Sequence, residues 1–220
     1  MLTKMALGFI GQLKPDRVTG RAVAASVALP PPDTQGGVPL MQALAQRRSC
    51  RDFSPAALPH DVLSNVLWAA FGVNRPKAHG RTPGRTAPSA MDAQEIDVYV
   101  ALRDGLYVYD PNAHSLSLVA ALDARKVTGY QDFVDEAPLD LVYVADHAHF
   151  PSVSREQRLA FSAVCAGAIA QNVSLYCASA GLATVVRGWF DRDALSKALC
   201  LSEHEHIVIT QTVGYPRMPS

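Results

Sequence analysis

A long, almost uncharged segment in the second half of the chain constrains the fold most strongly. Ser154 with Gln157 three residues later fits a capping box, and Gly181 is a typical stop, so we expect one helix that ends near Ala180. From Leu159 onward this helix is apolar nearly all round, so it must be buried on most sides, in a core or in a subunit interface. In a chain of 220 residues we favour the interface.

The rest of the pattern predicts strands and shorter helices around that helix. Period-two alternation predicts a strand near residues 96–102, and turn signals and further apolar runs predict strands near residues 106–109, 116–118, 139–144, 184–186 and 207–213. The first three of these strands are expected to form an antiparallel meander. Shorter helices are expected near residues 40–44, after Pro59 and after Asp191, whereas residues 73–91 read as a long loop. Runs of strands with helices around them indicate the α+β class.

Residues 1–37 differ from residues 38–220, which form the predicted domain. The first segment reads as an extended arm that ends in a proline run at 30–32 and a glycine pair at 36–37. A targeting segment is the weaker alternative, because charged residues interrupt the apolar stretch 5–10 before the small-residue run 22–25. We therefore expect a cytoplasmic protein. We also expect no membrane-spanning segment, since no apolar run approaches the ~20 residues that span a bilayer.

Composition narrows the function classes. Apolar residues make up 49% and charged residues 18%, which favours a large core over disorder. The formal net charge is zero, which argues against nucleic-acid binding. The cysteines form no CxxC pair; Cys165 and Cys177 read as core residues, and Cys50 fills a gap or, less plausibly, has a redox role.

A basic cluster lies directly after the short helix near residues 40–44. Arg47, Arg48 and Arg51 surround Ser49, and guanidinium groups match phosphate oxygens with two parallel hydrogen bonds. The alternative is a solvated charge run at a helix carboxyl end, where cations interact favourably with the helix dipole. The cluster predicts a site for a small phosphorylated ligand.

Several other site types find no support in the sequence. Neither G-x-G-x-x-G nor G-x-x-x-x-G-K occurs, and H-E-x-x-H and G-x-S-x-G are also absent. His147 with His149 and His204 with His206 form H-x-H pairs, but no third ligand cluster supports a metal site. We expect these histidines to be exposed in loops.

The order of four motifs resembles the nitroreductase superfamily of FMN-dependent oxidoreductases. These motifs are the arginine–serine cluster at 47–51, Ala87-Pro88-Ser89 with Gln94, the segment 181–188 after the long helix, and Val213-Gly214-Tyr215-Pro216. Residues 65–75, 107–110 and 128–133 look like the SagB-type dehydrogenase branch, which includes enzymes that oxidise peptide azolines to azoles.

The resemblance implies a fold, a cofactor and a set of contacts. It implies an intertwined homodimer with FMN at the interface and hydride transfer through flavin N5 by a ping-pong mechanism. Pro88 and Ser89 are expected to reach the flavin of the other subunit, and a backbone N–H of the strand after the long helix is expected to face N5, where Gly188 permits close approach. The implied cofactor-binding residues are Arg47, Arg48, Ser49, Arg51, Pro88, Ser89, Val186, Arg187 and Gly188.

Two departures and several alternatives stay open. Asp92 stands where the family often has Asn, and Arg217 is the one late candidate for phosphate binding, weaker than Arg47 or Arg51. The electron donor or acceptor is a small molecule or peptide, with NAD(P)H as a candidate donor. Nitro or quinone reduction needs no obligatory acid or base, whereas azoline oxidation needs a base, for which Lys77 and Tyr130 are only guesses. The rival function is a non-catalytic flavin- or peptide-binding accessory protein.

Overall fold

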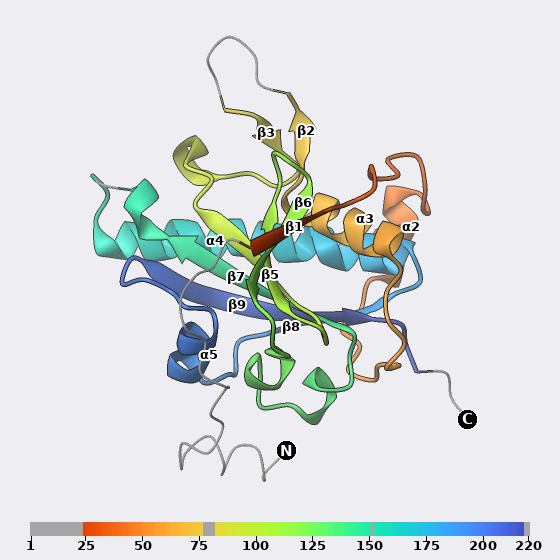
Figure 1. The fold of residues 1–220 in the computed structure, drawn as a ribbon. Helices are drawn as coiled ribbons and strands as arrows, with labels where there is room; N and C mark the ends of the chain where they lie inside the picture. The colour runs from red at the N-terminus through yellow and green to blue at the C-terminus, as the bar shows by residue number, and fades with distance from the viewer. Residues whose placement is uncertain (1–23, 77–81, 151, 218–220) are drawn as a thin grey trace.

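A seven-stranded sheet forms the centre of the molecule (Figure 1). The computed structural model of the chain describes residues 24–76, 82–150 and 152–217. Neighbouring strands run antiparallel in the order β1-β6-β5-β4-β7-β9-β8, which confirms the predicted sheet and its meander β4-β5-β6. The strands are β1 (Ala24–Ala28), β4 (Ile96–Ala101), β5 (Leu106–Asp110), β6 (Ser115–Ala120), β7 (Leu139–Asp146), β8 (Ala183–Arg187) and β9 (Glu205–Gly214).

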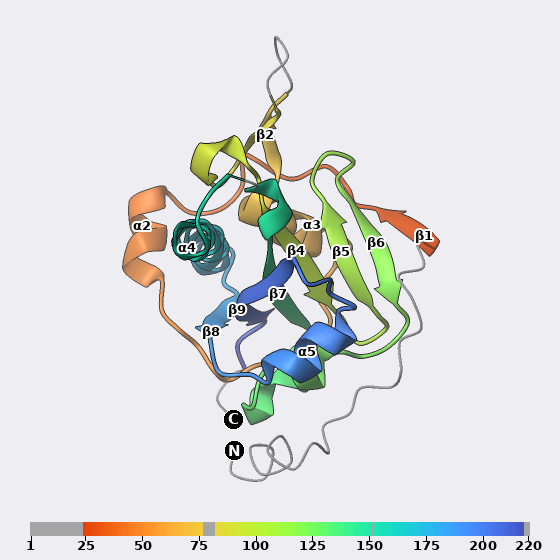
Figure 2. The ribbon, with the colours of Figure 1, turned by 90° about the vertical axis from the view of Figure 1, so that its left-hand side faces the viewer.

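Helices pack on both faces of this sheet (Figure 2). On one face lie α2 (Leu40–Gln46), α3 (His60–Phe71) and α4 (Arg155–Ser179), and α5 (Arg192–Ala198) lies on the other. The connections contain short 3₁₀ turns: η1 (Ala90–Asp92), η2 (Arg125–Val127), η3 (Asp132–Val134) and η4 (His147–His149). The helices expected near residue 40 and after Pro59 and Asp191 are all present, and the Asp191 carboxylate accepts a hydrogen bond from the backbone N–H of Ala194.

The central strands supply two separate hydrophobic cores because their side chains alternate between the two faces. In β4, Val98 and Val100 pack into the core beneath α3 and α4, whereas Tyr99 and Ala101 pack into the core beneath α5. The near-continuous apolar sequence of β7 follows from this arrangement, since both of its faces are buried.

The long helix α4 forms as the sequence predicts. The Ser154 hydroxyl accepts the backbone N–H of Gln157 at its start, and Gly181 adopts φ +69° just after its end. Its inner face packs against α2, α3, β8 and β9, but within a single chain Leu159 and Val164 keep exposed fractions of 48% and 70%. The helix is therefore buried on one side only, which leaves an apolar face for another surface.

Two expectations about the chain's organisation need correction. By length and composition α4 is apolar enough to cross a membrane, contrary to the sequence estimate, although its packing on the sheet accounts for that composition. The predicted loop 73–91 contains a short hairpin of β2 (Val73–Arg75) and β3 (Gly84–Arg85), which is too brief to show a period-two pattern. Within the arm, β1 extends the sheet by pairing with β6; the part before residue 24 lies outside the described residues.

A half-buried histidine joins the arm to the domain. The Nε2 atom of His114 lies 3.0 Å from the Pro30 carbonyl oxygen and 2.7 Å from the Ser64 hydroxyl on α3. Its Nδ1 atom lies 2.8 Å from the Tyr109 hydroxyl on β5. These distances fit a neutral imidazole that donates from Nε2 and accepts at Nδ1. Burial lowers the pKa of His114, although the Pro30 carbonyl opposes this shift.

This arrangement predicts a loss of stability in acid. The unfolded chain takes up the proton first, so the contribution of neutral His114 is lost as pH falls below about 6.5. We expect His114→Gln to be less stable than the wild type by about 1–2 kcal/mol at pH 7.5. It should also lose less free energy of unfolding than the wild type between pH 7.5 and 5.5, as measured by urea denaturation.

The exposed residue His60 provides the control for this comparison. His60→Gln should behave as the wild type at both pH values. An equal acid-induced loss in His114→Gln and the wild type would contradict the assignment of a neutral, half-buried His114.

Candidate functional site

The arginine segment is attached to the outer edge of the sheet. The backbone N–H of Cys50 donates to the Thr184 carbonyl of β8 at 2.9 Å, and Ser54 donates to the Tyr215 carbonyl after β9 at 2.9 Å. Between these two bonds, Phe53 is buried and forms an isolated β-bridge with Pro216. Cys50 packs against this small core, in agreement with the gap-filling role expected for it. The segment is thus held at a fixed position beside β8.

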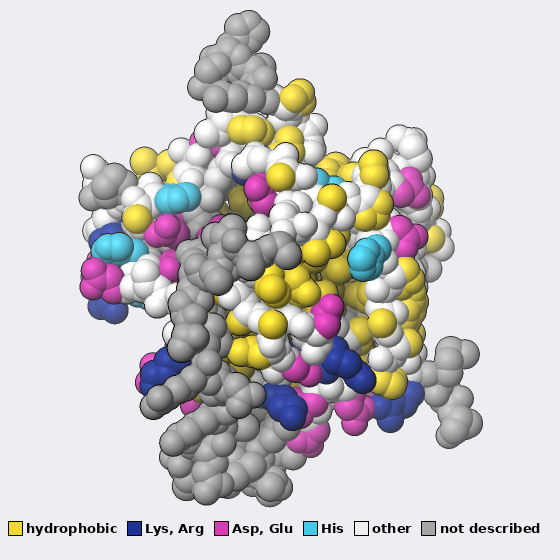
Figure 3. All heavy atoms as spheres, in the orientation of Figure 1, with side chains coloured by type: hydrophobic (Ala, Val, Ile, Leu, Met, Phe, Trp, Pro, Cys, Tyr) yellow, Lys and Arg dark blue, Asp and Glu magenta, His cyan; other side chains and the backbone are white. Residues whose placement is uncertain are grey.

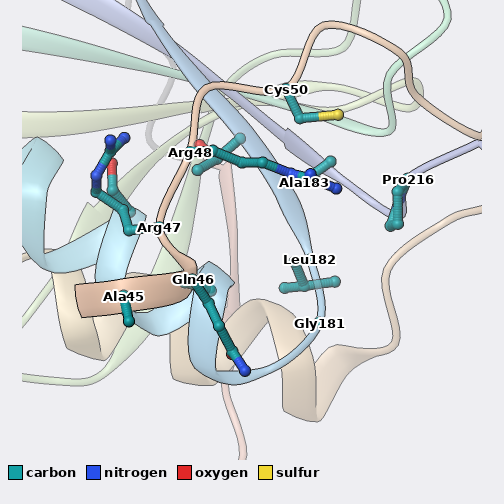
Figure 4. Close-up of a pocket in the computed structure, with 12 residues that line it drawn as sticks. Ala45, Gln46, Arg47, Arg48, Cys50, Gly181, Leu182, Ala183 and Pro216 are labelled. Carbon is teal, nitrogen blue, oxygen red and sulfur yellow. The ribbon is translucent and has the colours of Figure 1, made fainter. Parts of the chain in front are cut away.

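A cavity of about 460 Å³ opens between this segment, the end of α4 and the start of β8 (Figure 4). Arg47 and Arg48 both line it, and their guanidinium groups point in different directions, Arg48 toward Pro216. Ser49 and Arg51 are exposed and follow directly in the chain, but they do not line this cavity. Within residues 24–76, 82–150 and 152–217, no carboxylate pairs with Arg47, Arg48 or Arg51.

Arg217 is differently placed, because carboxylates already occupy its guanidinium group. It forms an ion pair of 3.2 Å with Asp52 and a closer one with Glu136, and it donates to the Phe53 carbonyl. Arg217 therefore ties the end of β9 to the arginine segment. Because its charge is already paired, Arg217 is a weaker candidate for phosphate binding than Arg47 or Arg51, as expected from the sequence.

The outer edge of β8 is open beyond the arginine segment. Because the Thr184 carbonyl points outward to Cys50, strand alternation places the backbone groups of Val186 and Gly188 at the same outer edge. Val186 has an exposed fraction of 42%, and a Cβ atom built on Gly188 would meet no atom within 4 Å among the described residues. The space beside Gly188 is thus available to a flat ligand, and a backbone donor faces it.

Arg187 points away from this edge and into the protein. Its guanidinium group donates to Asp140 on β7 at 2.6 Å and to the Thr128 carbonyl at 2.6 Å, and both charged side chains are almost completely buried. Burial lowers the pKa of Arg187, and Asp140 opposes that shift. The side chain of Arg187 therefore has a structural role. Because successive residues of a strand direct their backbone groups to opposite edges, the backbone groups of Arg187 face β9. The sequence did not predict this ion pair, although the position of a carboxylate, Asp140, within an apolar strand indicates that a buried partner is needed.

The Pro–Ser element lies at another part of the molecule. Pro88 is exposed, and the Ser89 hydroxyl lies 2.6 Å from the backbone N–H of Gln94 and 3.1 Å from the Glu95 carboxylate. The following turn is strained, since three non-glycine residues have positive φ: Met91, Asp92 and Gln94. The backbone N–H of Ala90 donates to the Cys165 sulfur on α4, whereas the arginine cavity borders Ala178 on the same helix.

These two anchor points on α4 give the separation of the two elements. Cys165 and Ala178 are about 20 Å apart along the helix at 1.5 Å per residue. One chain therefore does not bring Pro88 and Ser89 to its own arginine cluster. A second chain is required if both elements contact one ligand.

Asp92 and the candidate bases can also be placed. The Asp92 carboxylate accepts hydrogen bonds from Thr82 and Gln94, so it organises its own turn, as one reading of the sequence allowed. Tyr130 packs edge-on against Trp189, with ring centroids 5.7 Å apart, next to the open edge at Gly188. Burial and Asp191 raise the pKa of Tyr130, which does not favour its action as a base. Lys77 lies outside the described residues.

The expectation for the histidines is wrong in one case. His147 is 5% exposed, its ring lies 4.5 Å from that of His206, and its Nε2 atom lies 3.4 Å from the Ser162 hydroxyl. The turn η4 folds this residue back against α4 and β9, which the sequence spacing alone could not show. Among the described residues, no group of three histidine, cysteine or acidic side chains is arranged to hold a metal ion.

Comparison with known proteins identifies the class to which this fold and site belong. The family model described as the nitroreductase family matches residues 44–215. The chain therefore belongs to the nitroreductase family and is an oxidoreductase, which confirms the family recognised in the sequence. The SagB-type branch receives no such support.

Individual relatives agree with this assignment. A crystal structure of a candidate nitroreductase from Ralstonia eutropha JMP134 is 48% identical with a TM-score of 0.84, covering 94% of this chain and 96% of that one. A candidate nitroreductase of Methanocaldococcus jannaschii is 30% identical over 181 residues, which is 76% of this chain and 87% of the relative. A candidate nitroreductase of Desulfovibrio desulfuricans, solved in complex with FMN, is 21% identical with a TM-score of 0.57 and covers 82% of this chain and 88% of that one.

The buried ion pair behind β8 generates a stability prediction. Replacing Asp140 with leucine leaves the Arg187 charge buried without its partner, which we expect to lower the free energy of unfolding by about 3–5 kcal/mol. The double variant Asp140→Leu/Arg187→Leu removes both charges and should recover part of that loss. Urea denaturation of the wild type, the single variants Asp140→Leu and Arg187→Leu, and the double variant measures both effects.

The comparison of single and double variants is the decisive part of this experiment. If the two single substitutions simply add in the double variant, the two side chains do not interact as described. A loss below 1 kcal/mol in Asp140→Leu would also contradict a buried, ionised pair.

Proposed function

We propose that this protein is an FMN-dependent oxidoreductase that holds the cofactor between the arginine segment and the open edge of β8. One observation carries the proposal. The arginine segment, whose arginines have no carboxylate partners among the described residues, is hydrogen-bonded directly to the edge of β8, and this edge has free space beside Gly188. The family membership and the FMN-bound structure of a distant relative support the same cofactor. FMN, once bound, supplies the hydride chemistry.

Each predicted residue has a role that its position permits. Arg47, Arg48 and Arg51 would neutralise the phosphate, which carries nearly two negative charges, and Ser49 would bond a polar atom of the ribityl chain or the ring. The outward-facing backbone groups of Val186 and Gly188 would face the ring, whereas Arg187 would support the strand from behind. Pro88 and Ser89 would come from the second subunit, since about 20 Å of α4 separates them from the arginines of their own chain.

The catalytic cycle we propose is ping-pong. A reductant such as NAD(P)H binds and leaves before the acceptor enters the same open edge. Reduction of a nitro or quinone group then requires the protein only to position the acceptor and exclude water. Azoline oxidation would need a base, and burial and Asp191 raise the pKa of Tyr130 beside Gly188, so this residue is a poor candidate for that role.

The SagB-type motifs keep azoline oxidation as the second candidate activity. Under that reading the substrate is a peptide and oxygen or another acceptor receives the electrons. A non-catalytic accessory protein is the rival outside the enzyme class. We place the protein in the cytoplasm as part of the proposal.

A spectroscopic experiment separates these functions. We expect purified protein to be yellow, to bleach anaerobically with NAD(P)H or dithionite, and to regain colour with a nitroarene or quinone. Bleaching by a peptide azoline, with azole formed, would instead favour the dehydrogenase. A protein that binds no added FMN would contradict the proposed function.

The phosphate cluster yields a binding prediction. Arg47→Gln and Arg51→Gln each remove a charge-assisted interaction, so each should weaken FMN binding by about 1.5–3 kcal/mol. Quenching of flavin fluorescence during titration of apoprotein measures this affinity. Arg103→Gln, an exposed arginine in a distant turn, is the matched control and should bind FMN as the wild type does.

The exposed face of α4 yields an assembly prediction. We propose that it packs against a second copy in a homodimer, because Val164 is 70% exposed and Gly167 has nothing within 4 Å of a built Cβ atom among described residues. Val164→Arg should place a charge in that apolar interface and give a monomer in gel filtration. It is a sharper probe than Ala168, which is partly buried in its own core.

Ala113→Arg adds the same side chain to an exposed turn and serves as the control. It should leave the dimer intact. If Val164→Arg remains a dimer with native circular dichroism, α4 is not the interface.

A further inference from the structure

A second, strongly basic cleft lies at the other end of α4. Its cavity has a volume of about 560 Å³ and is lined by Arg155, Arg158, Arg192, His147, His206 and Ser162. In Figure 1 it lies at the left, where α4 begins near η4, α5 and the start of β9. Figure 3 shows histidine and basic side chains, with some acidic ones, gathered at this end of the molecule.

The positive groups of this cleft lack acidic partners among the residues that the structure describes. No ion pair joins Arg155, Arg158 or Arg192 to a carboxylate there, and no Asp or Glu lines the cavity. The Nε atom of Arg158 is buried without a hydrogen-bond acceptor in this part of the chain. Unmatched guanidinium groups around a cavity indicate an anionic ligand.

The neighbouring carboxylates are turned to other groups. Asp146 caps the backbone N–H of Ala148 and lies 3.8 Å from His149, and Glu205 accepts hydrogen bonds from Tyr99 and from the backbone of Ser202. Glu203 lies 3.7 Å from His204 at the exposed rim. None of these contacts, all between described residues, is with Arg155, Arg158 or Arg192.

The charges of the same arginines also act on His147. Burial is the main cause that lowers the pKa of His147, and His206, Arg158 and Arg155 lower it further, whereas Asp146 raises it. Arg192 is held in place by a hydrogen bond to the Ile207 carbonyl and by stacking over Phe190, 4.9 Å from its ring centroid. The cleft is therefore a pre-organised group of cations.

Its position relates it to the open edge of β8. Arg187, the last residue of β8, pairs with Thr210 of β9, and β9 continues beyond that point to Ile207 and His206 in the cleft. Thr210 and Ile207 are about 10 Å apart along the strand at 3.3 Å per residue. A molecule whose reacting ring lies beside Gly188 would place a group about 10 Å away in the cleft.

We propose that this cleft binds the phosphate or carboxylate group of the molecule that exchanges hydride at the open edge of β8. The identity of the substrate in this inference rests on the proposed function, whereas the oxyanion site rests on the structure of the cleft alone. The rigid placement of Arg192 and the unsatisfied Arg158 donor select an oxyanion over a neutral polar group. The cleft thereby favours anionic electron donors or acceptors over neutral ones of the same redox chemistry.

The first experiment tests the oxyanion site independently of flavin. Inorganic phosphate and acetate are titrated into the full-length protein while the ring resonances of His147 and His206 are followed by NMR. We expect saturable shifts, with the tighter anion identifying phosphate or carboxylate as the natural group. Arg155→Gln/Arg158→Gln should weaken binding by about tenfold or more, whereas the charge-matched control Arg103→Gln/Lys126→Gln should not.

The second experiment tests the link to turnover. Reduced nicotinamide mononucleotide, which carries a phosphate, is compared with neutral N-benzyl-dihydronicotinamide as electron donor. The double variant should raise KM for the phosphate-bearing donor about tenfold or more with kcat retained, and it should leave the neutral donor unchanged. The exposed single variant Arg155→Gln, with a smaller effect in the same direction, serves if the double variant does not fold.

Distinct outcomes overturn distinct claims. Wild-type histidine resonances that respond to neither phosphate nor acetate would overturn the oxyanion site. Equal impairment of both donors in the double variant would show that the arginines have a structural role only. A colourless protein that binds no added FMN would overturn the proposed flavin function, and the NMR titration would still decide the cleft.

Discussion

The hydrogen bond between the Cys50 N–H and the Thr184 carbonyl is the interaction on which the site depends. It holds the arginine segment against an edge strand and leaves the rest of that edge, from Val186 to Gly188, open. Edge strands normally need protection because their free backbone groups attract other chains. In the proposed function, the same free groups would provide donors and acceptors for a planar ring, and the arginines beside them would provide charge for its phosphate.

The helix α4 determines how far apart the candidate ligand-binding elements of one chain lie. The arginine cavity borders its last turns, the Pro–Ser element contacts its middle, and the basic cleft borders its first turns. In the proposed function, a single chain would thus distribute its ligand-binding groups along a helix whose apolar outer face is open. A second copy packed on that face would bring its own Pro–Ser element toward the arginines of the first. The dimer would then be a requirement of the chemistry as well as of stability.

Local signals in the sequence were sufficient to predict much of the fold and the segments that border the candidate site. The Ser154 cap and Gly181 define α4 by contacts within a few residues, and the near-continuous apolar sequence of β7 follows from burial on both faces. What the sequence did not reveal depends on pairing between distant segments. Asp140 and Arg187 meet across the intervening strand β9, and the burial of His147 depends on a turn that packs it against α4. Spacing along the chain carries no information about such contacts.

The most direct test concerns the free space beside Gly188. We predict that wild-type apoprotein binds FMN stoichiometrically and that Gly188→Val, whose side chain would enter the space assigned to the ring, binds it at least tenfold more weakly by fluorescence titration. Circular dichroism and unfolding of the variant should match the wild type, because no described atom lies within 4 Å of the added Cβ. Unchanged FMN affinity in a folded Gly188→Val protein would contradict the account.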